Sequence, residues 1–239
     1  MGKKAFTLAE VLITLGIIGV VAALTIPTLM QKTEERETVS KLKKVYSTLQ
    51  NAYSRAINDE GELSDWGTIT DTAASSDLVL QKFVPYLNVL KNCGTTDFSC
   101  FYTGTYSTFK GSSFSGSNAQ YNIIGTISEV SRILLSDGTS VAFDVWNGQA
   151  FVGVFIVDIN GKKKPNSIGR DTFIFEVFNN GKILPAGYPN DPSTSKFTCS
   201  YDDTSVRNGQ GCAAWVLQYE NMDYMHCAGL SWTGKTKCD

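Results

Sequence analysis

Residues 1–30 read MGKKAFTLAEVLITLGIIGVVAALTIPTLM, and this stretch decides how the chain is organised. A short leader with Lys3 and Lys4 precedes an apolar run over residues 6–26, which carries one charge, Glu10. At about 1.5 Å per residue, a helix of this length crosses the roughly 30 Å hydrocarbon layer of a membrane. The sequence therefore predicts a membrane-spanning helix, with the lysines on the cytoplasmic side and the rest of the chain outside the cytoplasm.

The acidic residue in this run needs an explanation. A carboxylate at the centre of a membrane helix costs about 2.5–3.5 kcal/mol on insertion scales, so a positively charged partner is expected. The α-amine of Phe6 is the nearest candidate if the chain is cut before that residue. The alternative is that Glu10 reaches the membrane interface, because it lies close to the end of the run.

No A-x-A-like site follows the apolar run, which argues against an ordinary secretory signal. The small residue, Ala5, precedes the run instead. The segment Ala5-Phe6-Thr7-Leu8-Ala9-Glu10 resembles the prepilin-type cleavage and methylation motif of type IV pilins and type II secretion pseudopilins. The alternative is an uncleaved signal anchor.

This resemblance implies specific roles for four residues. In the family, a prepilin peptidase cuts between the positions of Ala5 and Phe6, and the new amine is methylated. The glutamate at the position of Glu10 is linked to the N-terminal amine of a neighbouring subunit during assembly, and Pro27 matches a proline within the first helix. The chain departs from the family pattern at Ala5, where the family usually has glycine, and slower processing is the expected effect.

The chain is expected to have four parts: a leader (residues 1–5), a membrane half of the first helix (6–30), an amphipathic half (31–60) and an extracytoplasmic head (61–239). Pro27 removes one backbone donor, which predicts a kink or a melted turn. Apolar residues then recur at helical spacing and predict packing against the head; they are Val39, Leu42, Tyr46, Leu49, Tyr53 and Ala56.

The head shows strand and turn patterns. Asp137-Gly138 and Asn180-Gly181 each separate two apolar runs, as in β-hairpins, and residues 151–159 form a further strand-like run. A helix is also expected over residues 78–90. These patterns predict an α+β fold in which the long N-terminal helix packs on an antiparallel sheet, as the resemblance to pilins implies.

All six cysteines lie in the head, and an even number in a translocated domain predicts disulfides. A zinc site is disfavoured because C-x-x-C pairs are absent and the chain has one histidine. Among the possible pairings, nearest neighbours are preferred: Cys93–Cys100, Cys199–Cys212 and Cys227–Cys238.

One loop in the head carries a set of candidate metal ligands. Asp158, Asn160, Asn166 and Asp171 offer side-chain oxygens within a short segment, and oxygens of this kind bind calcium. Major pseudopilins bind calcium in the head, and the resemblance extends that possibility to this chain. The alternative is that these side chains cap turns, and three consecutive lysines at 162–164 oppose a bound cation.

The sequence favours a pilin-like structural subunit of a type II pseudopilus or a type IV pilus, with the prepilin peptidase, other pilin subunits and the membrane as partners; it does not decide between the two machines. The alternative is a membrane-tethered binding protein that uses the aromatic tail between Trp215 and Trp232. No catalytic motif is present, so an enzyme is not expected. The formal net charge of −2 and the lack of a basic face do not indicate nucleic-acid binding.

Overall fold

The structure is a computed structural model that describes residues 7–111, 129–146, 151–189, 197–205 and 207–239. Its α-helices are α1 (Leu8–Glu60), α2 (Ala73–Phe83) and α3 (Cys212–Tyr219), and its 3-10 helices are η1 (Leu63–Trp66), η2 (Val84–Tyr86), η3 (Phe98–Cys100) and η5 (Asp223–Met225). The strands are β1 (Val89–Gly94), β2 (Ser107–Thr108), β3 (Ser131–Leu135), β4 (Ser140–Val145), β5 (Phe151–Asp158), β6 (Ser167–Ile168), β7 (Thr172–Phe178) and β8 (Ile183–Pro185).

The chain divides into two compact units, one ending at Glu37 and the other running from Thr38 to Asp239. In the first unit, α1 is long and apolar enough to cross a membrane, and none of its apolar window is buried. The helix continues through Pro27 without a melted turn. The second unit begins at Thr38, because the part of α1 that follows contributes side chains to the core of the head.

Seven residues of α1 are buried in the head unit: Val39, Leu42, Val45, Leu49, Ala52, Tyr53 and Ala56. Five of them belong to the predicted stripe, and the sixth predicted residue, Tyr46, stacks on Phe175 with ring centroids 5.4 Å apart. The helix ends at Glu60. The next residue, Gly61, has a positive φ of 81°, and its amide donates to the carbonyl of Ile57, which forms a left-handed cap. The amphipathic packing predicted from the sequence is therefore confirmed.

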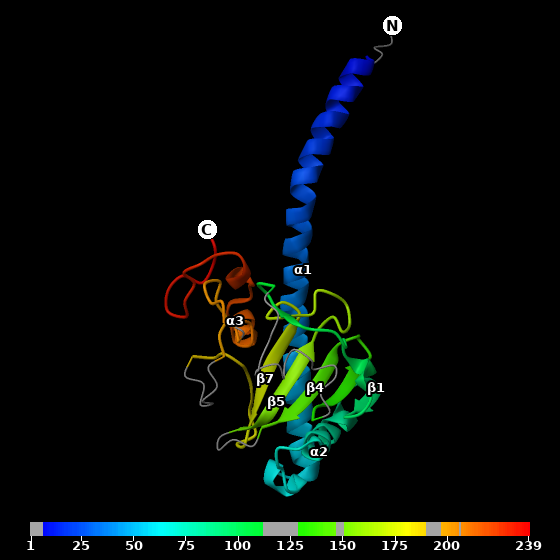
Figure 1. Ribbon diagram of the computed structural model, residues 1–239, viewed down its shortest axis with the longest axis vertical. Coiled ribbons are helices and arrows are strands. Elements are labelled where there is room, and N and C mark those ends of the chain that lie inside the picture. The colour runs from blue at the N-terminus through cyan, green and yellow to red at the C-terminus, as the bar shows by residue number, and fades with distance from the viewer. Residues whose placement is uncertain (1–6, 112–128, 147–150, 190–196, 206) are drawn as a thin grey trace. The chain divides into compact units, whose positions relative to one another are not determined.

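The head contains an eight-stranded sheet of order β1-β3-β4-β5-β7-β6-β2, with β8 also paired to β7. Figure 1 shows β4, β5 and β7 lying across the head-side half of α1. Strands β1, β3, β4, β5 and β7 pair antiparallel, as expected. The short strand β6 pairs in parallel with β7, and β2 pairs in parallel with β6. The sheet is therefore mixed, and the fold is of the α+β class.

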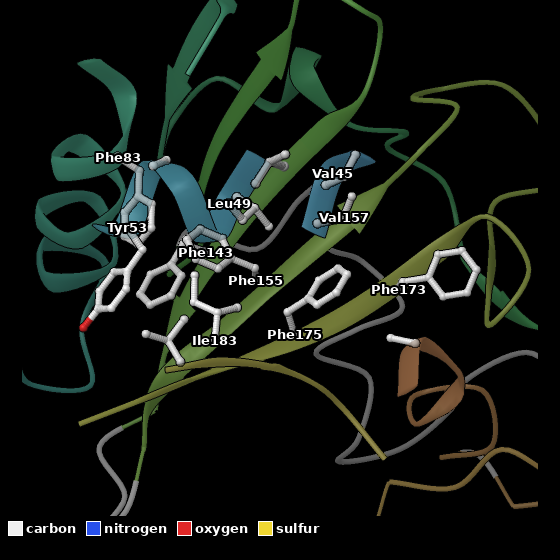
Figure 2. Close-up of a cluster of buried hydrophobic side chains, with 14 of the residues drawn as sticks. Val45, Leu49, Tyr53, Phe83, Phe143, Phe155, Val157, Phe173, Phe175 and Ile183 are labelled. Carbon is white, nitrogen blue, oxygen red and sulfur yellow. The ribbon is translucent and has the colours of Figure 1, made fainter. Parts of the chain in front are cut away.

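Alternate residues of the central strands fill two cores, one on each face of the sheet. The face toward α1 and α2 carries aromatic contacts, including Phe83 against Phe155 at 4.9 Å and Phe143 against Phe155 at 4.8 Å between ring centroids. Figure 2 shows this cluster, with Leu49 of α1 beside the rings. The opposite face buries Val154, Ile156 and Ile174 together with the segment around Cys100 and Tyr106. Burial on both faces explains why β4 and β7 are buried along their whole length.

Both predicted hairpins are confirmed, since β3–β4 turns at Asp137-Gly138 and β7–β8 turns at Asn180-Gly181. The helix expected over residues 78–90 is wrong in its bounds. The α-helix α2 ends at Phe83, a 3-10 turn containing Pro85 follows, and residues from Val89 onward form a strand. Proline lacks the backbone donor that would continue an α-helix, which accounts for the change.

Strand β8 lies outside β7 and is also tied to α1. The amide of Ala186 donates to the carbonyl of Ile174, and the amide of Phe178 donates to the carbonyl of Lys182. The intervening carbonyl of Ile183 accepts a hydrogen bond from the hydroxyl of Tyr46 at 3.1 Å. These bonds tie β8 both to β7 and to α1.

Candidate functional site

The first site is the start of α1, where Glu10 forms a capping box with Thr7. The backbone amide and the hydroxyl of Thr7 donate to Oε2 of Glu10 at 2.8 and 2.9 Å. The hydroxyl of Thr7 accepts from the amide of Glu10 at 3.2 Å. The sequence signal for this cap is the T-x-x-E spacing of Thr7 and Glu10, which is typical of a helix start.

This capping geometry occupies one carboxylate oxygen. Both hydrogen bonds reach Oε2, and Oε1 of Glu10 makes no hydrogen bond within the described residues. The other predicted processing residues, Ala5 and Phe6, lie outside the described residues. Pro27 lies inside the continuous helix, three turns before the head unit.

The second site is the loop between β5 and β7, where the structure brings together the four candidate calcium ligands. Asp171 accepts from the backbone amides of Asn166 at 2.8 Å and Ser167 at 2.6 Å, and from the side-chain amide of Asn160 at 3.1 Å. Asp158 accepts from the amide of Asn160 at 3.2 Å. These hydrogen bonds cap turns of the loop, as the alternative to calcium binding expects.

Two features of the loop nevertheless fit a cation. The side-chain oxygens Oδ1 of Asn160 and Asn166 are buried and have no hydrogen-bond partner among the described residues. Burial raises the pKa of Asp158 well above its usual range, and the nearby charge of Asp171 raises it further. A calcium ion would satisfy the amide oxygens and offset the repulsion between the carboxylates. Among the described residues, this loop included, no group of three His, Cys, Asp or Glu side chains could hold a metal; the loop offers two carboxylates and two amide oxygens.

The cysteines form the predicted nearest-neighbour disulfides, Cys93–Cys100, Cys199–Cys212 and Cys227–Cys238. No free cysteine remains among the described residues. The bond at Cys227 removes the thiol next to His226, so a Cys–His nucleophile is not available there. The disulfides also agree with an oxidising compartment for the head.

The aromatic residues of the C-terminal tail pack mainly on one another. Trp232 lies 5.4 Å from both Trp215 and Tyr219, measured between ring centroids, and the hydroxyl of Tyr219 donates to the carbonyl of Trp232. Trp215 is 2% exposed. These contacts hold the last disulfide loop against α3, which gives the tail aromatics a structural role.

Sequence reasoning missed a set of charged residues buried on the face of the sheet away from α1. They are Arg132, Asp144 and Glu176, each exposed by 1% or less. The strand register places Asp144 and Glu176 on either side of Val154. Burial raises the pKa of Asp144 to about 7 and lowers that of Arg132 to about 10. In the sequence, the only indication of these buried charges is a charged residue within an apolar run, such as FIFEVF in β7.

Comparison with known proteins adds no relative: no protein-family model, no curated protein and no solved structure matches the chain.

Proposed function

We propose that the protein is a pilin-like structural subunit, anchored by the N-terminal part of α1 and assembled through that helix into a type II pseudopilus or a type IV pilus. The observation that carries the proposal is the single carboxylate of an otherwise uncharged apolar segment. A simple membrane tether has no use for this charge, whereas an assembling helix can pair it with the N-terminal amine of a neighbouring copy.

The geometry at the start of α1 supports this role. Glu10 uses Oε2 to cap its own helix, which leaves Oε1 available to a second positive group. A processed chain beginning at Phe6 would supply an amine of this kind. The disulfide-bonded head would then lie outside the cytoplasm, in the periplasm or on the filament surface.

The capping box makes the choice of variant important. Glutamine also serves as the third residue of a capping box, so Glu10→Gln keeps the cap and removes the charge. We expect Glu10→Gln to be inserted and processed normally but to be missing from sheared filaments. Thr7→Val is the matched control, because it removes the capping hydroxyl and keeps the charge, and it should still assemble. Normal incorporation of Glu10→Gln would exclude the charge-pairing role.

The alternative, a tethered binding protein with an aromatic ligand face, has weaker support. The tail aromatics are engaged with one another, and Tyr188, which is 43% exposed, borders them and bonds Gln218. Under this alternative, Glu10→Gln would have no effect, and removal of Trp232 would abolish attachment without altering filament number.

A further inference from the structure

A polar hollow lies within the head unit, between α1 and the turn that joins β7 to β8. It encloses about 370 Å³, and small-ligand sites typically span about 300–1,000 Å³. One wall is about one turn of α1, which contributes Gln50, Asn51, Tyr53 and Ser54, and the other wall is residues 181–184. Because Gln50, Asn51 and Ser54 are exposed, the hollow is open to solvent.

Hydrogen bonds hold the two walls of the polar hollow together. The hydroxyl of Tyr46 and the side-chain amide of Gln50 both donate to the carbonyl of Ile183, at 3.1 and 3.4 Å. Gly181 adopts a positive φ of 82° and lies against Tyr53, since a Cβ added to it would be 3.1 Å from the Tyr53 hydroxyl oxygen. The shape of the hollow is therefore set before a ligand arrives, which reduces the entropy cost of binding.

The hydroxyl of Tyr53 is the feature that points to a ligand. Tyr53 is 4% exposed, and its hydroxyl is buried without a hydrogen-bond partner among the residues that the structure describes. Figure 2 shows this hydroxyl directed away from the other labelled rings. Burial, together with the nearby charge of Glu62, raises the pKa of Tyr53 to about 12, so the hydroxyl stays protonated and can both donate and accept. A ligand atom that bonds to it would remove the unfavourable burial of an unpaired group.

The rest of the polar hollow offers both donors and acceptors. The side-chain nitrogen of Gln50 donates to Ile183 and to the hydroxyl of Tyr46, which leaves the side-chain oxygen of Gln50 as an acceptor. The Ser54 hydroxyl donates to the backbone carbonyl of Gln50 at 3.0 Å, which leaves the hydroxyl oxygen as an acceptor. The ammonium group of Lys182 only donates.

This combination of groups matches sugar hydroxyls better than it matches an anion. A sugar hydroxyl both donates and accepts, so it can pair with each kind of group in the polar hollow. A carboxylate or phosphate group mainly accepts, and it would face the acceptor oxygens of Gln50 and Ser54 as well as the charge of Glu62 near Tyr53.

We propose that the polar hollow binds a carbohydrate of one or two sugar units, with one sugar hydroxyl bonded to Tyr53 and others to Gln50, Ser54 and Lys182. The inference goes beyond the structural role proposed above and rests on the head unit alone. An anionic ligand is the competing occupant, and the test distinguishes the two.

The test uses the full chain in lauryldimethylamine oxide, because a detergent with a sugar headgroup would compete for the polar hollow. The chain is applied to an array of neutral, phosphorylated and sulfated mono- and disaccharides, and the affinity for the best neutral sugar is measured by isothermal titration. We expect a subset of neutral sugars to bind, and Tyr53→Phe to weaken this binding by about fivefold or more. Without sugar, Tyr53→Phe should melt at the wild-type temperature, which separates loss of the hydroxyl from misfolding.

Two further variants complete the test. Tyr201→Phe is the matched control, because Tyr201 is exposed and does not line the polar hollow, and it should bind the sugar as wild type does. Lys182→Gln keeps a donor and removes the charge, so it should retain binding to a neutral sugar. Equal affinities of Tyr53→Phe and wild type, or an array on which no neutral sugar binds, would overturn the inference. Binding that is restricted to phosphorylated or sulfated sugars and lost in Lys182→Gln would assign the hollow to an anion instead.

Discussion

The hydroxyl of Tyr106 donates a hydrogen bond of 3.1 Å to the carboxylate of Asp158, and both side chains are fully buried. The bond joins the segment after η3 to the end of β5 and supports the loop that follows. The Tyr106 hydroxyl is one of the few donors that offset the buried charge of Asp158. Burial raises the pKa of Asp158 well above its usual range.

Removing this donor should destabilise the protein in a pH-dependent way. We expect Tyr106→Phe to lower the free energy of unfolding by about 1–3 kcal/mol when Asp158 is charged, and by less under acidic conditions where it is protonated. Urea unfolding at pH 4.5 and pH 8 measures the difference. Tyr53→Phe is the control, because the buried Tyr53 hydroxyl has no hydrogen-bond partner among the residues that the structure describes, and its loss should cost nothing. Equal losses for the two variants would contradict the assignment.

The buried carboxylate of Asp144 gives a second pH prediction. Because burial raises its pKa to about 7 in the folded state, the folded protein binds this proton more tightly than the unfolded chain. Its contribution to stability should therefore fall as the pH rises from about 4 to about 7, by at most about 4 kcal/mol. Asp144→Asn keeps an oxygen for the indole of Trp146 and should be more stable than wild type at pH 8, but not at pH 4.

Asp137→Asn tests a carboxylate whose pKa is shifted in the opposite direction. Burial raises the pKa of Asp137, but hydrogen bonds from Lys44 and Thr139 outweigh it, so the net pKa is lowered. This variant should lose stability at neutral pH and lose little in acid. Parallel pH profiles for wild type and both variants would show that neither carboxylate is linked to folding.

Two of the disulfides close loops of similar length, but they lie in different parts of the head. Cys199–Cys212 closes 13 residues at the start of α3, and Cys212 is fully buried. Replacing both cysteines by alanine should lower the free energy of unfolding by about 2–4 kcal/mol. The matched control replaces Cys227 and Cys238, which close 11 residues of the exposed tail, and should leave the melting of the sheet core nearly unchanged. Thermal unfolding followed by near-ultraviolet circular dichroism distinguishes them.

Calcium binding at the loop between β5 and β7 predicts a shift in melting temperature. At ten times its dissociation constant, calcium would add about 1.4 kcal/mol, which corresponds to several degrees for a chain of this size. We expect the full chain in detergent to melt higher in millimolar calcium than in chelator, and Asp171→Asn to lose this response. Magnesium serves as the ionic control. An unchanged melting temperature in millimolar calcium would leave turn capping as the whole role of these residues.

Prepilin-type processing predicts the mass of the native chain. We expect a mature protein that begins at a methylated Phe6, and a slower but complete cut after Ala5. Intact-mass and N-terminal analysis from native membranes measures both. Ala5→Gly should speed processing, whereas a bulky residue such as leucine at position 5 should block it. A chain that still begins at Met1 would indicate an uncleaved anchor and would remove the filament interpretation.

Local sequence patterns predicted the elements whose signals are local. The long helix, its apolar stripe, both hairpins and the disulfide pairing follow from spacing and turn chemistry over short stretches. The sequence also predicted that the four candidate loop residues lie together, because Asp158 and Asp171 are close along the chain. The hydroxyl of Tyr106, which donates to Asp158, was not predicted, because the two residues are 52 positions apart.

The features that were missed depend on tertiary structure. Glu176 is a single charge within the apolar run of β7, and a charge on one face of a strand is typical of a face that lies in water. Here both faces of β7 are covered, so the acidic side chain is buried. The parallel pairing of β2 with β6 rests on two residues of each strand, which is too short to leave a pattern in the sequence.

The position of Pro185 in β8 has a consequence for solubility. Hydrogen bonds of Lys182 and Ala186 face β7, so the backbone groups of Ile183 and Pro185 point away from the sheet. The Ile183 carbonyl is already bonded to Tyr46, and Pro185 has no amide to donate. A strand from another molecule would therefore find almost no free backbone donor or acceptor at this edge of the sheet. Heads crowded together at high local concentration are thereby protected from edge-to-edge aggregation on this side of the sheet.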